Sequence, residues 1–341
     1  MKTITTTIWL AWLCIACPVG RVAAEDEHLA QISVRVLDDA RQPVTNAQVN
    51  VGTFERWVPG DNFGHDQYKK ASAFTDTNGQ CSVDLSGPRS RYSFMALPPS
   101  GYYRSDALHY TFTNAVDGKW QPWNPLVEFR LRRILNPIPM YAKRVEFYGE
   151  KKVPAEGKPL GYDLMKGDWV APFGTGSESD FVILLQRAPE REAMSYWGNK
   201  PRPYKLYDVT LDIAFSNDGA GVQPAYAQQE GSALILSREA PETGYQTNLV
   251  KRTFREEGEA GHSDIRGSAG YFFRVRTKRD EKGRIVSALY GKIQGDVDVD
   301  RHGQVRFTYY LNPTDKDRNL EFDPSRNLFT GLKSTEQVKE P

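Results

Sequence analysis

Three aspartates at alternate positions, in the stretch DVDVDRHGQVRF at residues 296–307, are the pattern in this sequence that most resembles a metal site. A calcium loop between two helices needs a glycine at its sixth position and a distant glutamate that binds through both oxygens. Here Arg301 occupies the sixth position, and Arg306 lies near the place of the glutamate. In a strand, residues two apart are separated by about 7 Å, too far to surround one ion. We therefore predict a hairpin whose aspartates face solvent, with a calcium-stabilised adhesin as the alternative.

Histidines and other catalytic groups show no pattern that identifies a reaction. The five histidines are at positions 28, 65, 109, 262 and 302, without the spacing of metal ligands. The motifs HExxH and GxSxG and a phosphate-binding glycine loop are absent. Two local sets resemble acid–base or nucleophilic groups: His65 with Asp66, and His262 with Ser263 and Asp264. Because triad members usually lie far apart in sequence, adjacency is weak support, and a polar turn is the simpler interpretation of both sets.

Paired carboxylates could still serve a glycoside hydrolase, because the fold sets their separation and the sequence does not show it. The candidates in that general sense are Asp168, Asp180, Asp208 and Asp212. A more specific hypothesis places Asp168 and Trp169 opposite Arg318 across a pocket. The competing interpretation is that Arg318 helps to dock an extended C-terminal segment by bonding to backbone groups that a regular strand would otherwise satisfy.

Two aromatic, glycine-rich loops, at residues 57–70 and 101–123, could bind a sugar, since aromatic faces combine apolar area with polar edges. The residues that would form such a stacking platform are Trp57, Tyr102, Tyr103, Trp120 and Trp123. Alternatively, these side chains cover the open end of a small sandwich or pack against a second domain. Spacing does not separate the two interpretations, because it does not encode exposure.

The elements that must position these residues are strands. The chain has 341 residues, enough for two domains that each bury a core. It contains 12% aromatic and 39% hydrophobic residues with 21 prolines and 28 glycines, a composition that favours short strands joined by turns. No segment keeps a helical period for long. We therefore predict an all-β fold of two antiparallel β-sandwich domains in tandem.

Alternating segments identify the first domain at residues 30–134. The stretch VLDDARQPVTNAQVNV at residues 36–51 gives two strands around a turn, and FTDTNGQCSV at residues 74–83 gives a hairpin turn at Asn78 and Gly79. In this order the segments resemble the carboxypeptidase regulatory-like module, a small transthyretin-like β-sandwich. Such modules are usually non-catalytic, so the resemblance implies a scaffold or binding role.

A second sandwich at residues 146–330 is predicted after a proline-containing linker at residues 135–145. Runs such as FVILLQR at residues 181–187 and YDVTLDIAFS at residues 207–216 indicate a larger, jelly-roll-like domain. An extended C-terminal strap and a loose charged tail at residues 331–341 should follow. The segments NPIPMYAKRVEF, GYDLMKGDWVAPFGTG and YYLNPTDKDRNLEFDPSRNLF, in this order, resemble an uncharacterised family of secreted bacterial proteins, which carries no activity to transfer.

Residues 1–24 are typical of an export signal. An apolar run at residues 8–17 is too short to span a bilayer, and small residues precede an acidic segment, so we expect cleavage after Ala24. The alternative is a lipoprotein signal cut before Cys17. Cleavage after Ala24 leaves Cys81 alone, which excludes an intrachain disulfide and favours a small buried residue there over a nucleophile. The mature chain would then be secreted or periplasmic, without a membrane span.

These observations favour a secreted, non-catalytic binding or surface-assembly protein. Its partner would be a polysaccharide or another envelope protein, and no cofactor or bound metal is expected. Removal of Lys2 and Arg21 with the signal leaves 42 basic against 43 acidic residues, a balance that argues against a nucleic-acid partner. The alternative is a carbohydrate-active or other hydrolytic enzyme whose site lies in the second domain, around Asp168 and Trp169.

Overall fold

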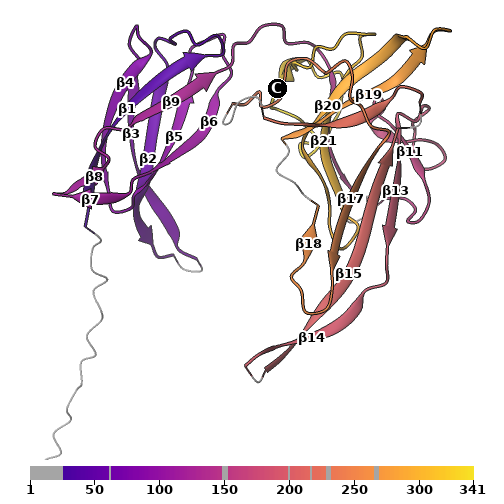
Figure 1. Cartoon of the computed structure of the whole chain (residues 1–341), viewed down its shortest axis with the longest axis horizontal. Coiled ribbons are helices and arrows are strands. Elements are labelled where there is room, and N and C mark those ends of the chain that lie inside the picture. The colour runs from indigo at the N-terminus through magenta and orange to yellow at the C-terminus, as the bar shows by residue number, and fades with distance from the viewer. Residues whose placement is uncertain are drawn as a thin grey trace, which may run out of the picture.

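The computed structural model describes residues 26–60, 63–147, 153–198, 200–215, 217–227, 232–264 and 269–341. These residues form two β-sandwiches that lie side by side (Figure 1). The predicted all-β fold is confirmed, since helical structure within these ranges is limited to a 3-10 turn at Pro324–Arg326. A helix long and apolar enough to cross a membrane is not found in the described ranges. The predicted export signal and Cys17 lie outside them.

The first sandwich is built from nine strands in two sheets. One sheet contains β1 (His28–Asp38), β4 (Gln80–Gly87), β7 (Asn114–Val116), β8 (Lys119–Gln121) and β9 (Leu126–Leu131). The other has the order β3 (His65–Phe74), β2 (Gln48–Val58), β5 (Arg91–Leu97) and β6 (Ser105–Thr111). The prediction of antiparallel pairing needs one correction, because β9 and β8 both run parallel to β1.

Period-two alternation explains the core of this sandwich. Ile32 and Val34 on β1, and Val49 and Val51 on β2, point inward and are almost fully buried. The predicted turn before β4 depends on Gly79, which has a φ of +70° and whose Cβ would come within 2.5 Å of a backbone carbonyl. Only glycine fits both the conformation and the space.

The second sandwich also has two sheets. The first has the order β10 (Tyr141–Phe147), β21 (Val305–Asn312), β20 (Ile285–Val299), β19 (Gly270–Arg279) and β16 (Gly221–Ala225). The other has the order β12 (Asp168–Trp169), β11 (Leu160–Asp163), β13 (Phe181–Arg187), β15 (Lys200–Ala214), β17 (Asn248–Arg255) and β18 (His262–Ser263), and β14 (Arg191–Trp197) pairs with β15. Five of these ten pairings join strands that are consecutive in sequence, and the chain passes from one sheet to the other four times. β10 begins at Tyr141, inside the predicted linker.

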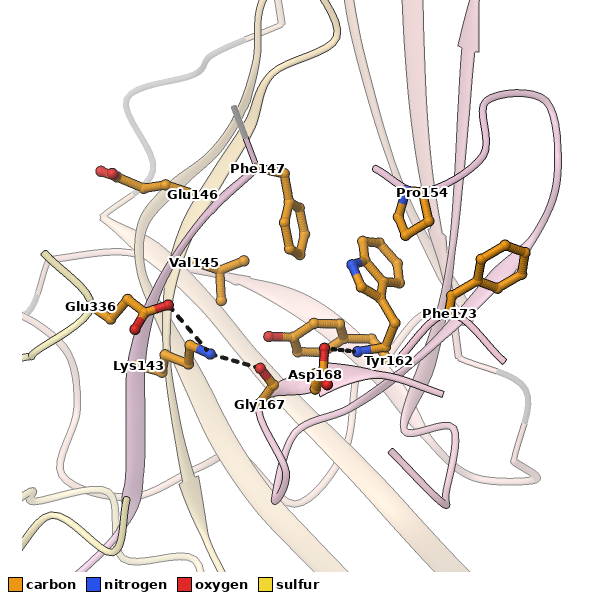
Figure 2. Close-up of a pocket in the computed structure, with 11 residues that line it drawn as sticks. Lys143, Val145, Glu146, Phe147, Pro154, Tyr162, Gly167, Asp168, Phe173 and Glu336 are labelled. Atoms are coloured by element: carbon orange, nitrogen blue, oxygen red, sulfur yellow. Dashed lines mark hydrogen bonds and ion pairs between the residues drawn. The ribbon is translucent and has the colours of Figure 1, made fainter. Parts of the chain in front are cut away.

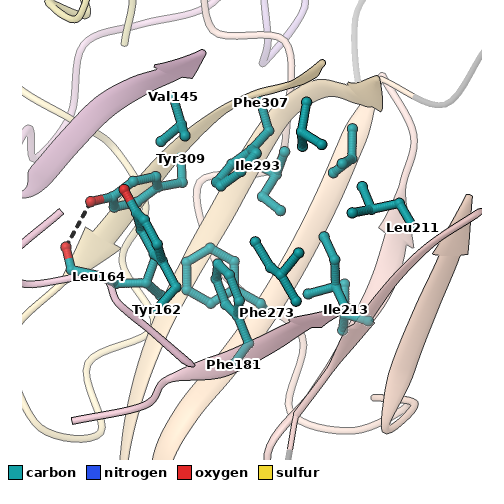
Figure 3. Close-up of a cluster of buried hydrophobic side chains, with 14 of the residues drawn as sticks. Val145, Tyr162, Leu164, Phe181, Leu211, Ile213, Phe273, Ile293, Phe307 and Tyr309 are labelled. Atoms are coloured by element: carbon teal, nitrogen blue, oxygen red, sulfur yellow. Dashed lines mark hydrogen bonds between the residues drawn. The ribbon is translucent and has the colours of Figure 1, made fainter. Parts of the chain in front are cut away.

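The core of the second sandwich lies between these sheets and is rich in aromatic rings (Figure 3). Tyr162 stacks on Phe181 with ring centroids 5.6 Å apart, and both rings lie edge-on to Phe307. The hydroxyl of Tyr309 donates to the carbonyl of Leu164 at 2.7 Å, so its polar end is satisfied inside the core. Aromatic pairs of this kind add about 0.5–1.5 kcal/mol each beyond their burial.

The C-terminal segment that follows β21, which we call the strap, forms a third layer. It covers the outer face of the sheet that contains β10, β21, β20, β19 and β16. Leu320 and Phe322 are fully buried there, as expected for an apolar strap. The tail at residues 331–341, which the charged sequence predicts to be loose, packs on the same layer. Val338 is buried, and the hydroxyl of Tyr310 donates to the carbonyl of Glu340 at 3.3 Å. One apolar anchor, backbone hydrogen bonds and the ion pairs of Glu336 with Lys143 and of Glu340 with Arg104 thus hold this charged segment.

A small apolar cluster of Tyr103, Ala233 and Leu234 joins the two sandwiches. Beside it, the buried guanidinium of Arg132 crosses from the end of β9 and donates to the carbonyl of Leu234 at 2.8 Å and to that of Leu236. A buried charge needs such partners, because desolvation otherwise makes it costly. The two domains therefore share a polar contact inside their interface.

Glu321 of the strap completes this interface from the other side. Its carboxylate is almost fully buried and accepts the Tyr103 hydroxyl and the backbone N–H groups of Leu135 and Asn136, each at 2.9 Å. Arg238 lies 3.7 Å from the same carboxylate. Several directional contacts thus converge on one buried group.

The aspartate-rich stretch forms the predicted hairpin, since β20 pairs antiparallel with β21 around the turn at residues 300–303. The prediction that all three aspartates face solvent is wrong for Asp296. Its side chain is 8% exposed and makes an ion pair with Lys251 at 2.7 Å. Asp298 pairs with Arg306, and Asp300 accepts backbone N–H groups of the turn. In the part of the chain that the structure describes, no three carboxylate, histidine or cysteine side chains are grouped as metal ligands.

Candidate functional site

A pocket of about 420 Å³ in the second sandwich contains Asp168 and Trp169, the residues of the more specific sequence hypothesis (Figure 2). Strands β10, β11 and β12 form it, together with the loop that follows β12 and the C-terminal segment. Its described lining combines aromatic rings on one side with charged groups on the other. This division is typical of ligand pockets, in which apolar surface gives affinity and a few polar groups give orientation.

The aromatic side consists of Phe147, Tyr162, Trp169 and Phe173. The Trp169 ring lies 4.7 Å from that of Phe147 and 5.4 Å from that of Tyr162, in a tilted and an edge-on arrangement respectively. These three rings are buried and fix one another, whereas Phe173 is 46% exposed. The pocket therefore has a rigid aromatic wall with one accessible ring beside it.

Asp168 supplies a fixed carboxylate next to this wall. Its oxygens accept the N–H of Trp169 at 2.9 Å, and the N–H and hydroxyl of Thr175 at 2.8 Å each. Burial acts to raise the pKa of Asp168, but these hydrogen bonds and nearby Lys143 outweigh it, so the pKa lies below its ordinary value. The group is therefore an ionised acceptor at neutral pH and is unsuited to act as a general acid.

Lys143 and Glu336 form the charged rim. The Lys143 ammonium donates to the carbonyl of Gly167 at 2.7 Å and lies 3.8 Å from the Glu336 carboxylate (Figure 2). Gly167 has a φ of +63°, and a Cβ there would come within 3.0 Å of Lys143 and of Phe329. Glycine at this position lets the lysine side chain cross the loop.

A buried ionic network holds the loop at residues 163–180 that carries Asp168. The Arg276 guanidinium contacts Asp163 at 3.0 Å and Asp180 at 2.8 Å. Asp163 also accepts backbone N–H groups at both ends of the loop, including those of Met165 and Ser177. Arg276 adopts a φ of +53° at an irregularity between β19 and β20. Such conformations persist where surrounding contacts determine them, and here the arginine ties the loop to the sandwich.

The described lining of this pocket contains no serine, cysteine or histidine that could serve as a nucleophile or base. The carboxylates of Glu146, Asp168 and Glu336 and the Lys143 ammonium can accept and donate hydrogen bonds, and Phe173 offers an apolar face. The arrangement can therefore hold a polar ring, such as a sugar.

Arg318 lies elsewhere, so the predicted arrangement opposite Asp168 needs correction. Its guanidinium donates to the carbonyl of Ala240 at 2.8 Å and contacts Glu239 and Glu242. This matches the competing interpretation, in which the arginine docks the C-terminal segment by bonding to a backbone group. Lys143, not Arg318, is the cation beside Asp168.

The other aspartates of the hydrolase hypothesis do not converge on the pocket. Asp180 belongs to the Arg276 network, where burial raises its pKa. Asp208 pairs with Arg252 through two hydrogen bonds of 2.8 Å. Asp212 lies on β15, and one of its carboxylate oxygens is buried without a hydrogen-bond partner among the described residues.

The five aromatic residues of the first domain do not share one surface. Trp120 is a core residue that donates to the carbonyl of Gly87 at 3.2 Å, and Tyr103 lies in the interface between the domains. Tyr102 is half-buried near Arg133. Trp57 and Trp123 are 57% and 37% exposed. The two alternative roles, covering a sandwich and packing against the second domain, therefore each account for part of the set.

Sequence reasoning missed most of the pocket. Lys143 and Phe147 belong to NPIPMYAKRVEF, and Tyr162 and Phe173 belong to GYDLMKGDWVAPFGTG, two segments distinguished in the sequence only by a family resemblance. Glu336 is distant from both in sequence, and the path of the C-terminal segment brings it to them.

Comparisons with known proteins give no further identification. No family model and no curated protein matches the sequence. One similar solved structure is a DUF3823 family protein from Parabacteroides merdae ATCC 43184, with 10% identity and a TM-score of 0.17, covering 82% of this chain and 96% of that chain. Another is a leucine-rich repeat protein from Bacteroides thetaiotaomicron VPI-5482, with 10% identity and a TM-score of 0.17, covering 56% of this chain and 22% of that chain. At these scores neither similarity supports an argument about function.

Proposed function

We propose that this chain is an exported, non-catalytic binding protein whose second domain holds a saccharide unit in the pocket around Asp168. The observation that carries the proposal is the geometry of that pocket, in which an aromatic wall faces an ionised carboxylate and a lysine. Sugars offer apolar ring faces and hydroxyl edges, and such a pair of surfaces matches both. Asp168 already accepts three hydrogen bonds, and a carboxylate has about four acceptor positions, so one remains for a ligand hydroxyl.

Two features of the sequence support an exported binding role. The N-terminal 24 residues are typical of a signal, and residues 30–134 resemble the carboxypeptidase regulatory-like module, which is usually non-catalytic. In this proposal the first sandwich is a supporting and positioning domain, and the ligand is part of an extracellular or envelope polysaccharide.

A glycan array followed by calorimetry tests the proposal. Phe173→Ala and Asp168→Asn should each weaken binding of any positive glycan by roughly tenfold, since each removes an interaction of about 1–2 kcal/mol. Tyr226→Ala is the matched control, because Tyr226 is a 71% exposed aromatic residue of the same domain outside the described pocket lining. Loss of binding in all three variants, an array without any positive glycan, or turnover of a bound glycan would each contradict the proposal.

A further inference from the structure

The outer face of the β2–β3–β5–β6 sheet, on the first domain, carries a second hollow. Two adjoining depressions of about 430 and 440 Å³ share Gly52 and Ser93. The register places Lys70, Gly52, Ser93 and His109 directly opposite one another on four neighbouring strands. Directly paired residues point to the same face, so this row spans about 14 Å of the outer surface. We call the two depressions together the basic groove.

Gly52 gives the groove its depth. It lies in the middle of β2, where the alternating neighbours Val51 and Thr53 are buried in the core. Its φ is not in the left-handed region, and a Cβ there would meet the Ser93 hydroxyl at 3.3 Å as its nearest contact. The backbone therefore does not require glycine. A glycine inside a strand otherwise weakens it, and often marks a place where another chain or a ligand approaches closely.

Charge is distributed unevenly along the groove. Its described lining contains Lys70, Arg89, Arg91 and His109 and no aspartate or glutamate, although the whole chain has 44 basic and 43 acidic residues. Lys70 and Arg91 are exposed and form no ion pair with another described residue. A concave surface with several cations and no acid attracts an anionic ligand.

The uncharged lining adds groups that recognise a sugar chain. The polar side chains are Asn50, Ser72 and Ser93, and Tyr68, 53% exposed, lies beside Phe54 with ring centroids 6.4 Å apart. An aromatic ring, hydroxyl and amide groups and cations along one groove match a linear chain of acidic sugars. A lipid headgroup would instead occupy one point of this row.

We propose that the basic groove binds a linear acidic polysaccharide, with its carboxylate or sulfate groups on Lys70 and Arg91 and a sugar ring near Gly52. This site is separate from the pocket around Asp168 and takes a ligand of different charge. The two sites can be tested independently, because neutral glycans report on the pocket and anionic polymers on the groove.

The test is a titration of the full chain with polyguluronate oligosaccharides, with dextran of similar length as the neutral polymer. Binding of the anionic polymer at 50 mM salt, weaker at 300 mM and absent for dextran, is expected. The double variant Lys70→Gln/Arg91→Gln should weaken binding by roughly tenfold or more, since charge-assisted hydrogen bonds are lost. Lys119→Gln/Arg130→Gln changes the charge equally on the opposite sheet and should leave the affinity within about twofold. Gly52→Val, which fills the groove and suits a strand, should weaken binding without changing any charge.

Three outcomes would overturn the proposal. The first is the absence of polyguluronate binding at 50 mM salt. The second is equal weakening in the two double variants, which would indicate a response to total charge alone. The third is binding to phosphatidylglycerol vesicles but not to polyguluronate, which would assign the groove to a lipid surface. Circular dichroism of each variant ensures that a loss of binding is not a loss of fold.

Discussion

Lys292 is a buried lysine whose replacement should make the protein more stable. Its side chain is fully buried on the outer face of β20, and its ammonium has no hydrogen-bond partner among the described residues. Burial lowers the pKa of this lysine to about 7, and repulsion by Arg132 acts in the same direction against attraction by Glu321. Its ammonium lies 4.6 Å from the centre of the Tyr310 ring, a contact that compensates only part of the lost hydration.

The size of the effect follows from proton binding. The ordinary lysine pKa is 10.5, so between pH 7 and 10.5 the unfolded chain binds a proton that the folded chain does not. The free energy of unfolding therefore rises with pH over this range, by about 1.4 kcal/mol for each pH unit. Because of this one group, the free energy of unfolding is about 4 kcal/mol lower at pH 7 than at high pH.

Lys292→Met removes the amine and keeps most of the volume. We expect the variant to be about 2–4 kcal/mol more stable than the wild type at pH 7. Fitting a methionine side chain costs less free energy than burying the amine, and the substitution removes the second cost. The difference between the two should shrink as the pH rises towards 10. Urea unfolding at pH 6, 7, 8, 9 and 10 measures both quantities.

Lys251→Met is the matched control. Lys251 is also buried, but it faces Asp296 at 2.7 Å, and although burial acts to lower its pKa, Asp296 and Tyr271 raise it above the ordinary value. Its replacement removes the partner of a buried carboxylate and should destabilise the fold by about 3–5 kcal/mol. The reasoning about Lys292 is refuted if Lys292→Met is less stable than the wild type at pH 7, or if its stability follows pH in parallel with the wild type.

Four further outcomes are expected. Arg276→Met should destabilise the second domain by about 3–5 kcal/mol in urea, because it leaves Asp163 and Asp180 buried without their cation. Burial acts to raise the pKa values of Asp163 and Asp168, but hydrogen bonds outweigh it and hold both below the ordinary value. The ionised carboxylates therefore stabilise the fold above about pH 4, and this stabilisation is lost as the pH falls through the lowered values. Melting temperatures between pH 5 and 2 measure the loss. Val338→Ala should cost about 1–2 kcal/mol, whereas a loose tail would give no change. Calcium or a chelator should leave the melting temperature unchanged, because the three aspartates of the hairpin already have partners in the protein.

Strands were predictable where one face of a sheet is buried. Val209, Leu211 and Ile213 alternate on β15, and all three are buried in the core as the period of two requires. The turn at Gly79 was equally readable, because its residues are selected by backbone conformation rather than by distant contacts. Local rules of this kind account for most of the fold.

The third layer and the sites were not predictable in the same way. The tail has a single apolar anchor, Val338, and one residue gives no periodicity to read. Lys292 appears in the sequence as an ordinary polar position of a strand, yet the strap covers that face and buries it. Trp120 and Trp57 likewise look alike in the sequence, but Trp120 faces the core whereas Trp57 lies on an exposed part of β2, near its end. Such contacts depend on which segment covers which face.

The interface between the sandwiches bears on both proposals. Interfaces between domains often allow relative motion when they are small and polar. Here, however, Arg132 donates to carbonyl groups of the second domain, and Glu321 accepts the Tyr103 hydroxyl of the first. Buried hydrogen bonds depend on direction, so they favour one relative orientation and are lost if the domains turn. The pocket and the basic groove would then lie at a fixed separation.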